Sequence, residues 1–310
     1  MYSLTENAIR PQEVSWELLG KYHDPEHLQK LQTDRKYLYW VYEYKSRLED
    51  VNDKDIKNLL DPARREVGGT ILMSHLASIY KTAFFIGGGG MHHASCDVSE
   101  GSSLFVDIPI SWIMFKKPGQ KALYIDLDVH HGNGIALAKH QLKLEDSFFI
   151  IDLYNDTLFP LEGSEGEKLD NRSLSYVNIK KPFKTSITNE GYLKLLREAL
   201  DEAPKDFTII YYMANNDVLG KKDFSQVNEQ GIFERNDIVF NWARALDIPI
   251  AMFANNGYSK HGCERTYRSL KRLEKFFVYS TLFNNFSKVD PIFIKSSLSI
   301  TPISQCLKTS

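Results

Sequence analysis

Five short hydrophobic runs stand out along the chain, and each is nearly continuous rather than alternating with polar residues. The runs are five to seven residues long and rich in β-branched or aromatic side chains. This pattern is typical of strands that are buried on both faces of a parallel sheet. The runs cover residues 82–86, 121–125, 147–153, 207–213 and 248–253.

Segments with helix-forming composition separate these runs. The alternation of strands and helices predicts an α/β fold, with a parallel sheet and helices on both of its faces. The chain before residue 64 also looks helical and amphipathic, although Trp40, Tyr42 and Tyr44 alternate as they would in a strand. Residues 160–175 are mostly polar and predict a solvated loop. The expected helices cover residues 64–80, 104–115, 135–142, 189–202, 230–245 and 260–276.

The composition is that of an ordinary globular protein, with 310 residues of which 43% are hydrophobic and 25% charged. A formal net charge of −2 leaves no excess of Lys and Arg to displace phosphate counterions, so we expect no direct nucleic-acid binding. The three cysteines lack CxxC spacing, which fits a reducing compartment and argues against a disulfide framework or a thiolate zinc site. We see no signal-peptide core and no run of ~18 apolar residues, so we expect a cytoplasmic or nuclear protein without a membrane span.

Polar residues follow every one of the five hydrophobic runs. In chain order these polar sequences are GGGGMHH, DLDVHHGNG, DLYND, NND and NNGY. In open parallel sheets the ligand crevice lies at the carboxyl ends of the strands, so we expect these groups to converge at one edge. Each group also has an ordinary structural interpretation. A histidine pair often makes only local hydrogen bonds, an Asp can cap a helix, and an Asn-Gly pair can form a turn.

The segment that contains Asp126, Asp128 and His130 carries the strongest chemical signal. Strand alternation places these three side chains on one side of an extended segment. Leaving them unpaired at the end of a buried strand would cost several kcal/mol, unless a cation or hydrogen bonds satisfied them. One imidazole nitrogen and two carboxylate oxygens suit zinc, and three protein ligands leave the open position that a catalytic site needs. Asp128 and His130 supply two ligands and Asp217 is the natural third; the alternative is a solvated acidic strand end.

The five motifs, in this order and at these separations, resemble those of the zinc-dependent histone deacetylases. The sequences that carry the resemblance are GGGGMHH, DLDVHHGNG, IIDLYNDTLFP, MANNDVLG and NNGY. They are most similar to the class IV, histone deacetylase 11-like branch, because of the Asp-Leu-Tyr-Asn sequence and the Gly-Asn-Gly after the second histidine pair. The resemblance implies a three-layer arginase/deacetylase-like fold, with the active site at the carboxyl ends of the strands. It also implies one catalytic domain over residues 1–285, short and divergent before about residue 64. Weak structure signals in the Ser- and Lys-containing sequence after Asn285 predict a weakly structured tail over 286–310.

The resemblance further implies a role for individual side chains in the hydrolysis of an acylated lysine. A zinc ion would activate a water molecule, His93 would accept the proton from that water, and Tyr258 would donate a hydrogen bond to the developing oxyanion. The matching positions are Asp128, His130 and Asp217 for zinc; His92 and His93 for the dyad; Asp126 and Asn133 as their respective partners; Tyr258 facing the metal; Gly101, Ser102 and Gly257 for the substrate; and, for a structural potassium ion, Asp126 and Asp152 with the backbone carbonyls of Asp128, His130 and Leu153.

Several positions depart from the family pattern. Ser102 stands where deacetylases usually carry a Phe that forms a wall of the substrate channel, and Asn215 and Asn256 replace glycines near the metal. The expected substrate is an acylated lysine in a protein or peptide, such as a histone tail, with an acetyl group or a longer fatty-acyl group. The alternatives are a catalytically weak metal-binding protein that recognises acyl-lysine or acts as a scaffold, and a small-molecule amidohydrolase of the acetylpolyamine type.

Overall fold

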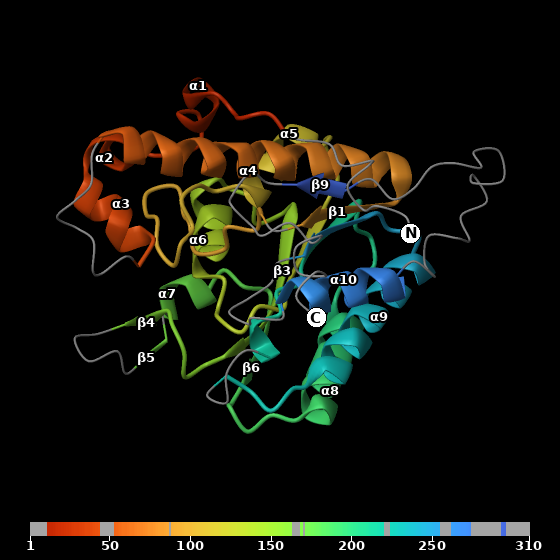
Figure 1. Ribbon diagram of the computed structural model, residues 1–310. Helices are drawn as coiled ribbons and strands as arrows, with labels where there is room; N and C mark the ends of the chain where they lie inside the picture. The colour runs from red at the N-terminus through yellow and green to blue at the C-terminus, as the bar shows by residue number, and fades with distance from the viewer. Residues whose placement is uncertain are drawn as a thin grey trace.

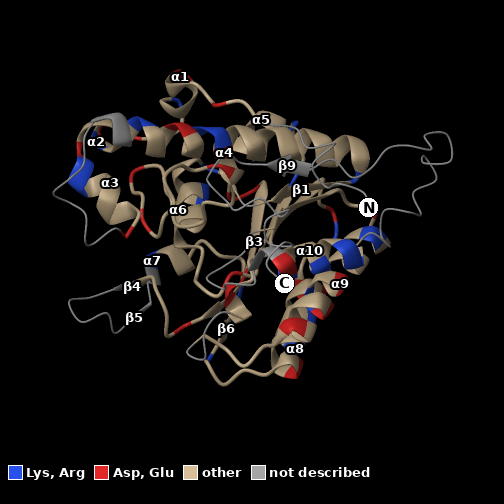
Figure 2. Ribbon diagram, viewed as in Figure 1, with Lys and Arg blue, Asp and Glu red and all other residues tan. Residues whose placement is uncertain are grey.

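The computed structural model describes most of the chain as one α/β arrangement, shown in Figure 1. No helix in the described part of the chain is both long enough and apolar enough to cross a membrane. Figure 2 shows acidic and basic residues interspersed over the helices, in keeping with the formal net charge of −2. The described residues are 11–43, 53–86, 88–162, 168–169, 171–219, 224–254, 262–273 and 293–295.

A seven-stranded sheet forms the centre of the molecule, and every strand pair in it is parallel. Its strand order is β6-β3-β2-β7-β8-β1-β9. Each of the five hydrophobic runs contains one strand, with bounds that differ from the expected ones by no more than two residues. The prediction of a parallel sheet is therefore confirmed. The strands are β1 (Thr82–Ile86), β2 (Ala122–Asp126), β3 (Phe148–Asn155), β6 (Ile179–Phe183), β7 (Ile209–Met213), β8 (Ile250–Ala254) and β9 (Phe293–Lys295).

Helices cover both faces of this sheet, as expected for three layers (Figure 1). One face packs against α4, α5 and α6, and the other packs against α8, α9 and α10. Adjacent strand residues such as Tyr211 and Tyr212 belong to different clusters, because successive side chains point to opposite faces. The covering helices are α4 (Asp53–Tyr80), α5 (Ile108–Phe115), α6 (Asn133–Gln141), α8 (Asn189–Glu202), α9 (Glu229–Ala245) and α10 (Gly262–Leu273).

The described part of the N-terminal segment is helical, as the sequence predicted. Trp40 lies in a helix and Tyr42 ends it, so their strand-like alternation was misleading, and Tyr44 lies outside the described residues. Three helices, α1 (Trp16–Leu19), α2 (Pro25–Thr33) and α3 (Arg35–Val41), pack against the first half of α4. Helix α4 begins at Asp53 rather than at residue 64 and contains Pro62. Leu60 and Ala63 beside this proline are buried against the N-terminal helices, and this packing offsets the backbone hydrogen bond that proline cannot make.

Two other expectations about elements need correction. Residues 160–175 contain the hairpin β4 (Leu161–Glu162) and β5 (Lys168–Leu169) and the helix α7 (Asn171–Leu174), and not only a solvated loop. Helix α5 begins at Ile108 rather than at residue 104, because Pro109 is favourable in the first turn of a helix. Strand β9, which lies within the residues 286–310 assigned to the tail, pairs with β1. Strand β6 was not predicted, because two lysines and a proline hide a strand that has one buried side.

Candidate active site

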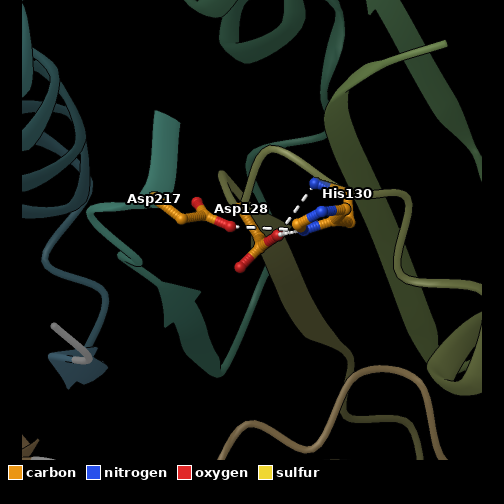
Figure 3. Close-up of side chains that lie close together, drawn as sticks. All are labelled: Asp128, His130 and Asp217. Atoms are coloured by element: carbon orange, nitrogen blue, oxygen red, sulfur yellow. Dashed lines mark hydrogen bonds and ion pairs between the residues drawn. The ribbon is translucent and has the colours of Figure 1, made fainter. Parts of the chain in front are cut away.

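The three candidate metal ligands come together at the carboxyl ends of two neighbouring strands, β2 and β7 (Figure 3). Asp128 and His130 follow β2, and Asp217 begins a short 3-10 helix after β7. Their ligand atoms all lie within 4.8 Å of one another. Nδ1 of His130 lies 2.9 Å from Oδ1 of Asp128 and 3.3 Å from Oδ2 of Asp217. The alternative of a solvated acidic strand end does not hold, because Asp128 and Asp217 are almost fully buried.

The electrostatics of these residues fit a bound cation. Oδ2 of Asp217 is buried and accepts no hydrogen bond from the described residues. Burial, together with the nearby Asp128 carboxylate, raises the pKa of Asp217 to about 7. Burial opposes protonation of His130, but the two carboxylates outweigh it and raise its pKa to about 10. A divalent ion would replace this proton between the two carboxylates, and the donor set of one nitrogen and two oxygens suits zinc.

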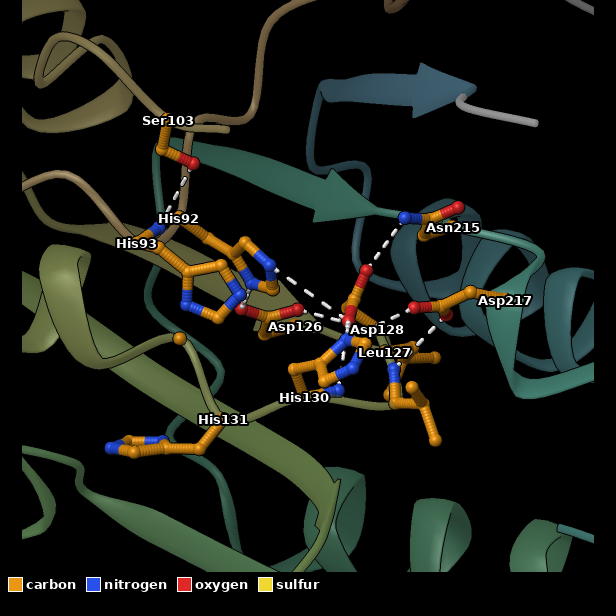
Figure 4. Close-up of polar contacts among 12 residues, drawn as sticks. His92, His93, Ser103, Asp126, Leu127, Asp128, His130, His131, Asn215 and Asp217 are labelled. Carbon is orange, nitrogen blue, oxygen red and sulfur yellow. Dashed lines mark hydrogen bonds and ion pairs between the residues drawn. The ribbon is translucent and has the colours of Figure 1, made fainter. Parts of the chain in front are cut away.

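The backbone around the triad is held by a buried arginine from α9. Nη1 of Arg235 donates hydrogen bonds to the backbone oxygens of Leu127 and Asn215, at 3.2 and 2.9 Å, and so ties the end of β2 to the end of β7. The Asn215 side chain, which replaces a family glycine, donates to Oδ2 of Asp128 at 2.6 Å. Asn215 therefore contacts a candidate ligand directly (Figure 4).

His92 and His93 follow β1 and lie beside the triad, with their ring centroids 4.0 Å apart. Nδ1 of His92 is 2.9 Å from Oδ2 of Asp126, and Nδ1 of His93 is 2.8 Å from Oδ1 of Asn133. Burial lowers the pKa of His92, but Asp126 and Asp128 outweigh it and raise that pKa to about 9. Burial and His92 hold the pKa of His93 well below its usual range. The structure thus pairs each histidine with the predicted partner and makes His93 the less easily protonated one.

The glycine-rich loop before the dyad is fixed by a buried carboxylate. Oδ2 of Asp107 accepts hydrogen bonds from Gly90 N–H and the Thr70 hydroxyl, both at 2.7 Å, and Oδ1 accepts from Met91 N–H at 3.2 Å. Gly90 has a φ of +67°, and a Cβ there would lie 2.6 Å from Sδ of Met213. Glycine at this position therefore allows the loop to lie directly against β7 and to present both histidines to the triad.

A cavity of about 260 Å³ joins the triad and the dyad. Gly101, Ser102 and Ser103 line it beside His93. Gly101 has a φ of +52°, and a Cβ there would lie 2.5 Å from Cδ2 of His93, so this position needs glycine. The Phe159 ring meets the His93 ring edge to face, with centroids 5.0 Å apart. Phe159 therefore supplies an aromatic contact at the dyad, although Ser102 lacks the aromatic ring that the family usually places there.

Sequence reasoning missed two carboxyl groups of this site. Glu66 of α4 is buried, lines the cavity and accepts a hydrogen bond from Gly89 N–H at 3.2 Å. Its burial raises its pKa to about 8. Glu66 lies within a helix and follows no strand, so the pattern of polar residues at strand ends could not identify it. Glu100 lies 2.5 Å from Nδ2 of Asn133 in an irregular segment, where no periodicity could have identified it.

The residues expected to hold potassium lie close together. Strand pairing sets Asp126 opposite Asp152, and Leu153 follows Asp152 in β3. Oδ2 of Asp152 is 2.6 Å from Nδ1 of His131, whereas Oδ1 is buried without a hydrogen-bond partner among the described residues. Figure 4 shows the His131 ring pointing away from the dyad. Its Nε2 lies 2.8 Å from the Ser173 hydroxyl, so His131 has a structural role in this arrangement.

Two predicted site residues, Tyr258 and Gly257, lie outside the described residues, as does Asn256. The structure therefore describes the triad, the dyad, their partners and the positions Gly101 and Ser102.

Comparisons with known proteins place this arrangement among histone deacetylase relatives. The model of the histone deacetylase domain matches residues 2–273. Histone deacetylase 2 of Arabidopsis thaliana is 31% identical over 227 residues, which cover 71% of this chain and 55% of that protein. The chain thus spans about half the length of this relative.

Solved structures of the same fold are much less similar in sequence. The HD domain of HDA15 has 17% identity and a TM-score of 0.63, and the match covers 88% of this chain and 77% of that one. An acetylpolyamine aminohydrolase from Burkholderia pseudomallei has 17% identity and a TM-score of 0.61, with 87% and 84% covered. At this identity the likeness concerns the fold.

Proposed function

The chain belongs to the histone deacetylase domain family, and we propose that it is a zinc-dependent hydrolase that removes acyl groups from lysine side chains of proteins or peptides. The observation that carries this proposal is the shared cavity, in which three potential metal ligands face two histidines of opposite protonation behaviour. Amide hydrolysis needs a proton acceptor for the attacking water and a proton donor for the leaving amine. The two histidines offer one of each.

Asp128, His130 and Asp217 would hold the zinc ion. Bound zinc supplies a Lewis acid that polarises a carbonyl and lowers the pKa of water towards ~7. The remaining site residues would orient the substrate and move protons. This metal requirement predicts that a chelator abolishes turnover and that added zinc restores it.

His93 would act as the general base, because its Nδ1 is occupied by Asn133 and its low pKa leaves Nε2 free to accept a proton. His92 would protonate the leaving lysine amine, because its pKa of about 9 keeps it protonated at neutral pH. Asp126 would stabilise that imidazolium through the 2.9 Å contact with Nδ1 of His92. This division of the dyad into an acid and a base follows from the different partners of the two rings.

Tyr258 would donate a hydrogen bond to the oxyanion, and Gly257 would lie beside the substrate; both roles rest on the family resemblance. Gly101 and Ser102 would line the path of the lysine side chain, together with the Phe159 ring beside His93. A serine in place of an aromatic wall leaves this side of the path wider and more polar.

Within this proposal the preferred acyl group is a short one such as acetyl. A long alkyl chain would have to bury its methylene groups against the Glu66 carboxyl, which has one hydrogen-bond donor, Gly89, among the described residues. Burying an incompletely paired polar group against hydrocarbon is unfavourable. Class IV membership, which we propose from the Gly132-Asn133-Gly134 and Asp-Leu-Tyr-Asn sequences, is the reason to test fatty-acyl groups as well.

A second candidate is a small-molecule amidohydrolase, because the fold is shared with an acetylpolyamine aminohydrolase and Ser102 removes a wall that would grip the lysine stem. A structural potassium ion at Asp126 and Asp152 is a further part of the proposal. The buried Oδ1 of Asp152, without a hydrogen-bond partner among the described residues, supports it.

The deciding experiment compares peptides that carry acetyl-, butyryl- or myristoyl-lysine with acetylated polyamines, using zinc-loaded protein and a chelator control. We expect chelator-sensitive release of the acyl group, fastest from acetyl-lysine peptides. Hydrolysis of the polyamines alone would assign the second candidate. Stoichiometric zinc binding without any hydrolysis would refute the enzymatic proposal and leave an acyl-lysine reader or scaffold.

A further inference from the structure

Behind the candidate base His93, the structure contains a chain of polar contacts that ends in a carboxylate. Nδ1 of His93 lies 2.8 Å from Oδ1 of Asn133, and Nδ2 of Asn133 lies 2.5 Å from Oε1 of Glu100. His93 and Asn133 are buried, whereas Glu100 is partly exposed. Asn133 begins α6, and Glu100 lies in the segment between the dyad and α5.

Asn133 alone does not determine how His93 carries its proton. An asparagine amide offers an acceptor oxygen on one side and a donor nitrogen on the other, and the two differ little in shape. With the oxygen facing His93, Nδ1 must carry the proton and Nε2 is free to accept another. With the nitrogen facing His93, Nδ1 must be the acceptor, and the proton moves to Nε2, which then cannot act as a base. The orientation of the amide therefore selects the imidazole tautomer.

Glu100 removes this ambiguity, because an ionised carboxylate can only accept hydrogen bonds. It binds the Nδ2 side of Asn133 and so turns Oδ1 towards His93. We infer that Glu100 is a positioning residue that acts through Asn133 to fix the Nδ1-protonated tautomer of His93, and so keeps Nε2 available as the general base.

The segment that carries Glu100 is itself held in place. Ser103 N–H donates to the Glu100 carbonyl oxygen at 2.8 Å, which closes a tight turn around Gly101. On the other side of Glu100, Ser99 N–H donates to the Tyr37 hydroxyl at 2.9 Å, and Ser99 Oγ lies 2.9 Å from Nε2 of His27. These contacts give the N-terminal helices α2 and α3 a part in the geometry of the dyad.

The inference rests on the proposed function, since a positioned base matters only for a reaction that uses it. Its primary test is therefore independent of turnover: ¹⁵N NMR of histidine-labelled, zinc-loaded protein reports which ring nitrogen of His93 is protonated. In the wild type we expect Nδ1–H. In Glu100→Ala we expect a mixture of tautomers, with a kcat that is at least tenfold lower and a KM within twofold. A wrong tautomer lowers kcat by up to about 10⁴ when the directly bonded partner of a catalytic histidine is changed.

Two further variants separate orientation from simple support of the fold. Glu100→Gln keeps the shape of the side chain but offers either an oxygen or a nitrogen to Asn133, so it should also give mixed tautomers. Adding Asn133→Asp to Glu100→Gln should restore the single Nδ1–H tautomer, because the new aspartate can only accept from His93 and Gln can donate to it. A purely structural role for Glu100 predicts an unchanged tautomer in Glu100→Gln, which keeps the shape of the side chain, and the double variant shows that any change acts through position 133.

The matched control is Glu145→Gln, which alters an exposed carboxylate that lies 2.8 Å from a different histidine, His140. It should leave both the His93 tautomer and kcat unchanged. The inference is overturned if Glu100→Ala and Glu100→Gln keep the single wild-type tautomer, or if the double variant fails to restore it. A wild-type protein without hydrolase activity would refute the proposed function instead, and the NMR result would still decide the role of Glu100.

Discussion

The buried Glu66 carboxyl should make the stability of the protein depend on pH in a way that one substitution removes. Only 7% of this residue is exposed, and burial raises its pKa from 4.5 to about 8, although the hydrogen bond from Gly89 opposes the shift. Between these two values the folded state keeps a proton that the unfolded state releases. The contribution of Glu66 to stability is therefore fully present below pH 4.5 and is lost as the pH rises through 8.

The size of the effect follows from the shift of about 3.5 pH units. Each unit corresponds to about 1.4 kcal/mol, so the free energy of unfolding should fall by about 5 kcal/mol over the whole window because of this group. In Glu66→Gln the side chain stays neutral at every pH and can still accept from Gly89. The difference in unfolding free energy between the variant and the wild type should therefore change by about 4 kcal/mol in favour of the variant between pH 5 and pH 8.

The assay is urea unfolding of metal-free wild type and Glu66→Gln, followed by circular dichroism and tryptophan fluorescence at half-unit steps from pH 5 to 8.5. Using the difference at each pH cancels the groups that titrate in both proteins. Glu190→Gln, at an exposed carboxyl in the first turn of α8, is the control and should show no such trend. A difference for Glu66→Gln that stays constant within about 0.5 kcal/mol over this range would mean that the carboxyl is ionised in the folded protein. The cavity would then hold a negative charge at Glu66.

Three further predictions concern the proposed reaction. Asp217→Asn should weaken zinc binding by at least about 100-fold in a chelator competition, since it removes a ligand charge; an affinity within tenfold of wild type would exclude Asp217 as a ligand. Tyr258→Phe should keep the zinc content but lower kcat by about 10² to 10³, as expected on losing an oxyanion donor, and near-normal turnover would contradict its role. Ser102→Phe should lower the KM for acetyl-lysine peptides several-fold with kcat within twofold, because an aromatic wall would cover the lysine stem; an unchanged KM would place this stem elsewhere.

The hydrophobic runs predicted the central strands well, because strands buried on both faces need continuous apolar sequence. The edge strand β6 shows the limit of that rule. Burial alternates along β6, and the sequence Lys180-Lys181-Pro182 predicts a loop rather than a strand. The segment is a strand because it pairs with β3. Helix α4 shows a second limit of local sequence rules. Pro62 predicts a break in the helix, but packing against the N-terminal helices keeps it continuous.

The candidate site was predictable where its residues follow buried strands. Asp128, His130 and Asp217 were expected together because parallel strands end at one edge, and β2 and β7 are indeed neighbours. Glu66 and Glu100 were not expected, because neither follows a strand. Their contacts with Gly89 and Asn133 join residues far apart in the chain, and no local pattern encodes such a contact.

The amino-acid sequence by itself determined the order of strands and helices and the chemical identity of the groups at each strand end, because both depend on short-range hydrophobic pattern and composition. Only the tertiary structure decided which of these groups meet, and with which protonation. The opposite pKa shifts of His92 and His93 arise from burial and from the different partners Asp126 and Asn133. Such shifts depend on distance and solvent exclusion in three dimensions, and these exist only once the chain is packed.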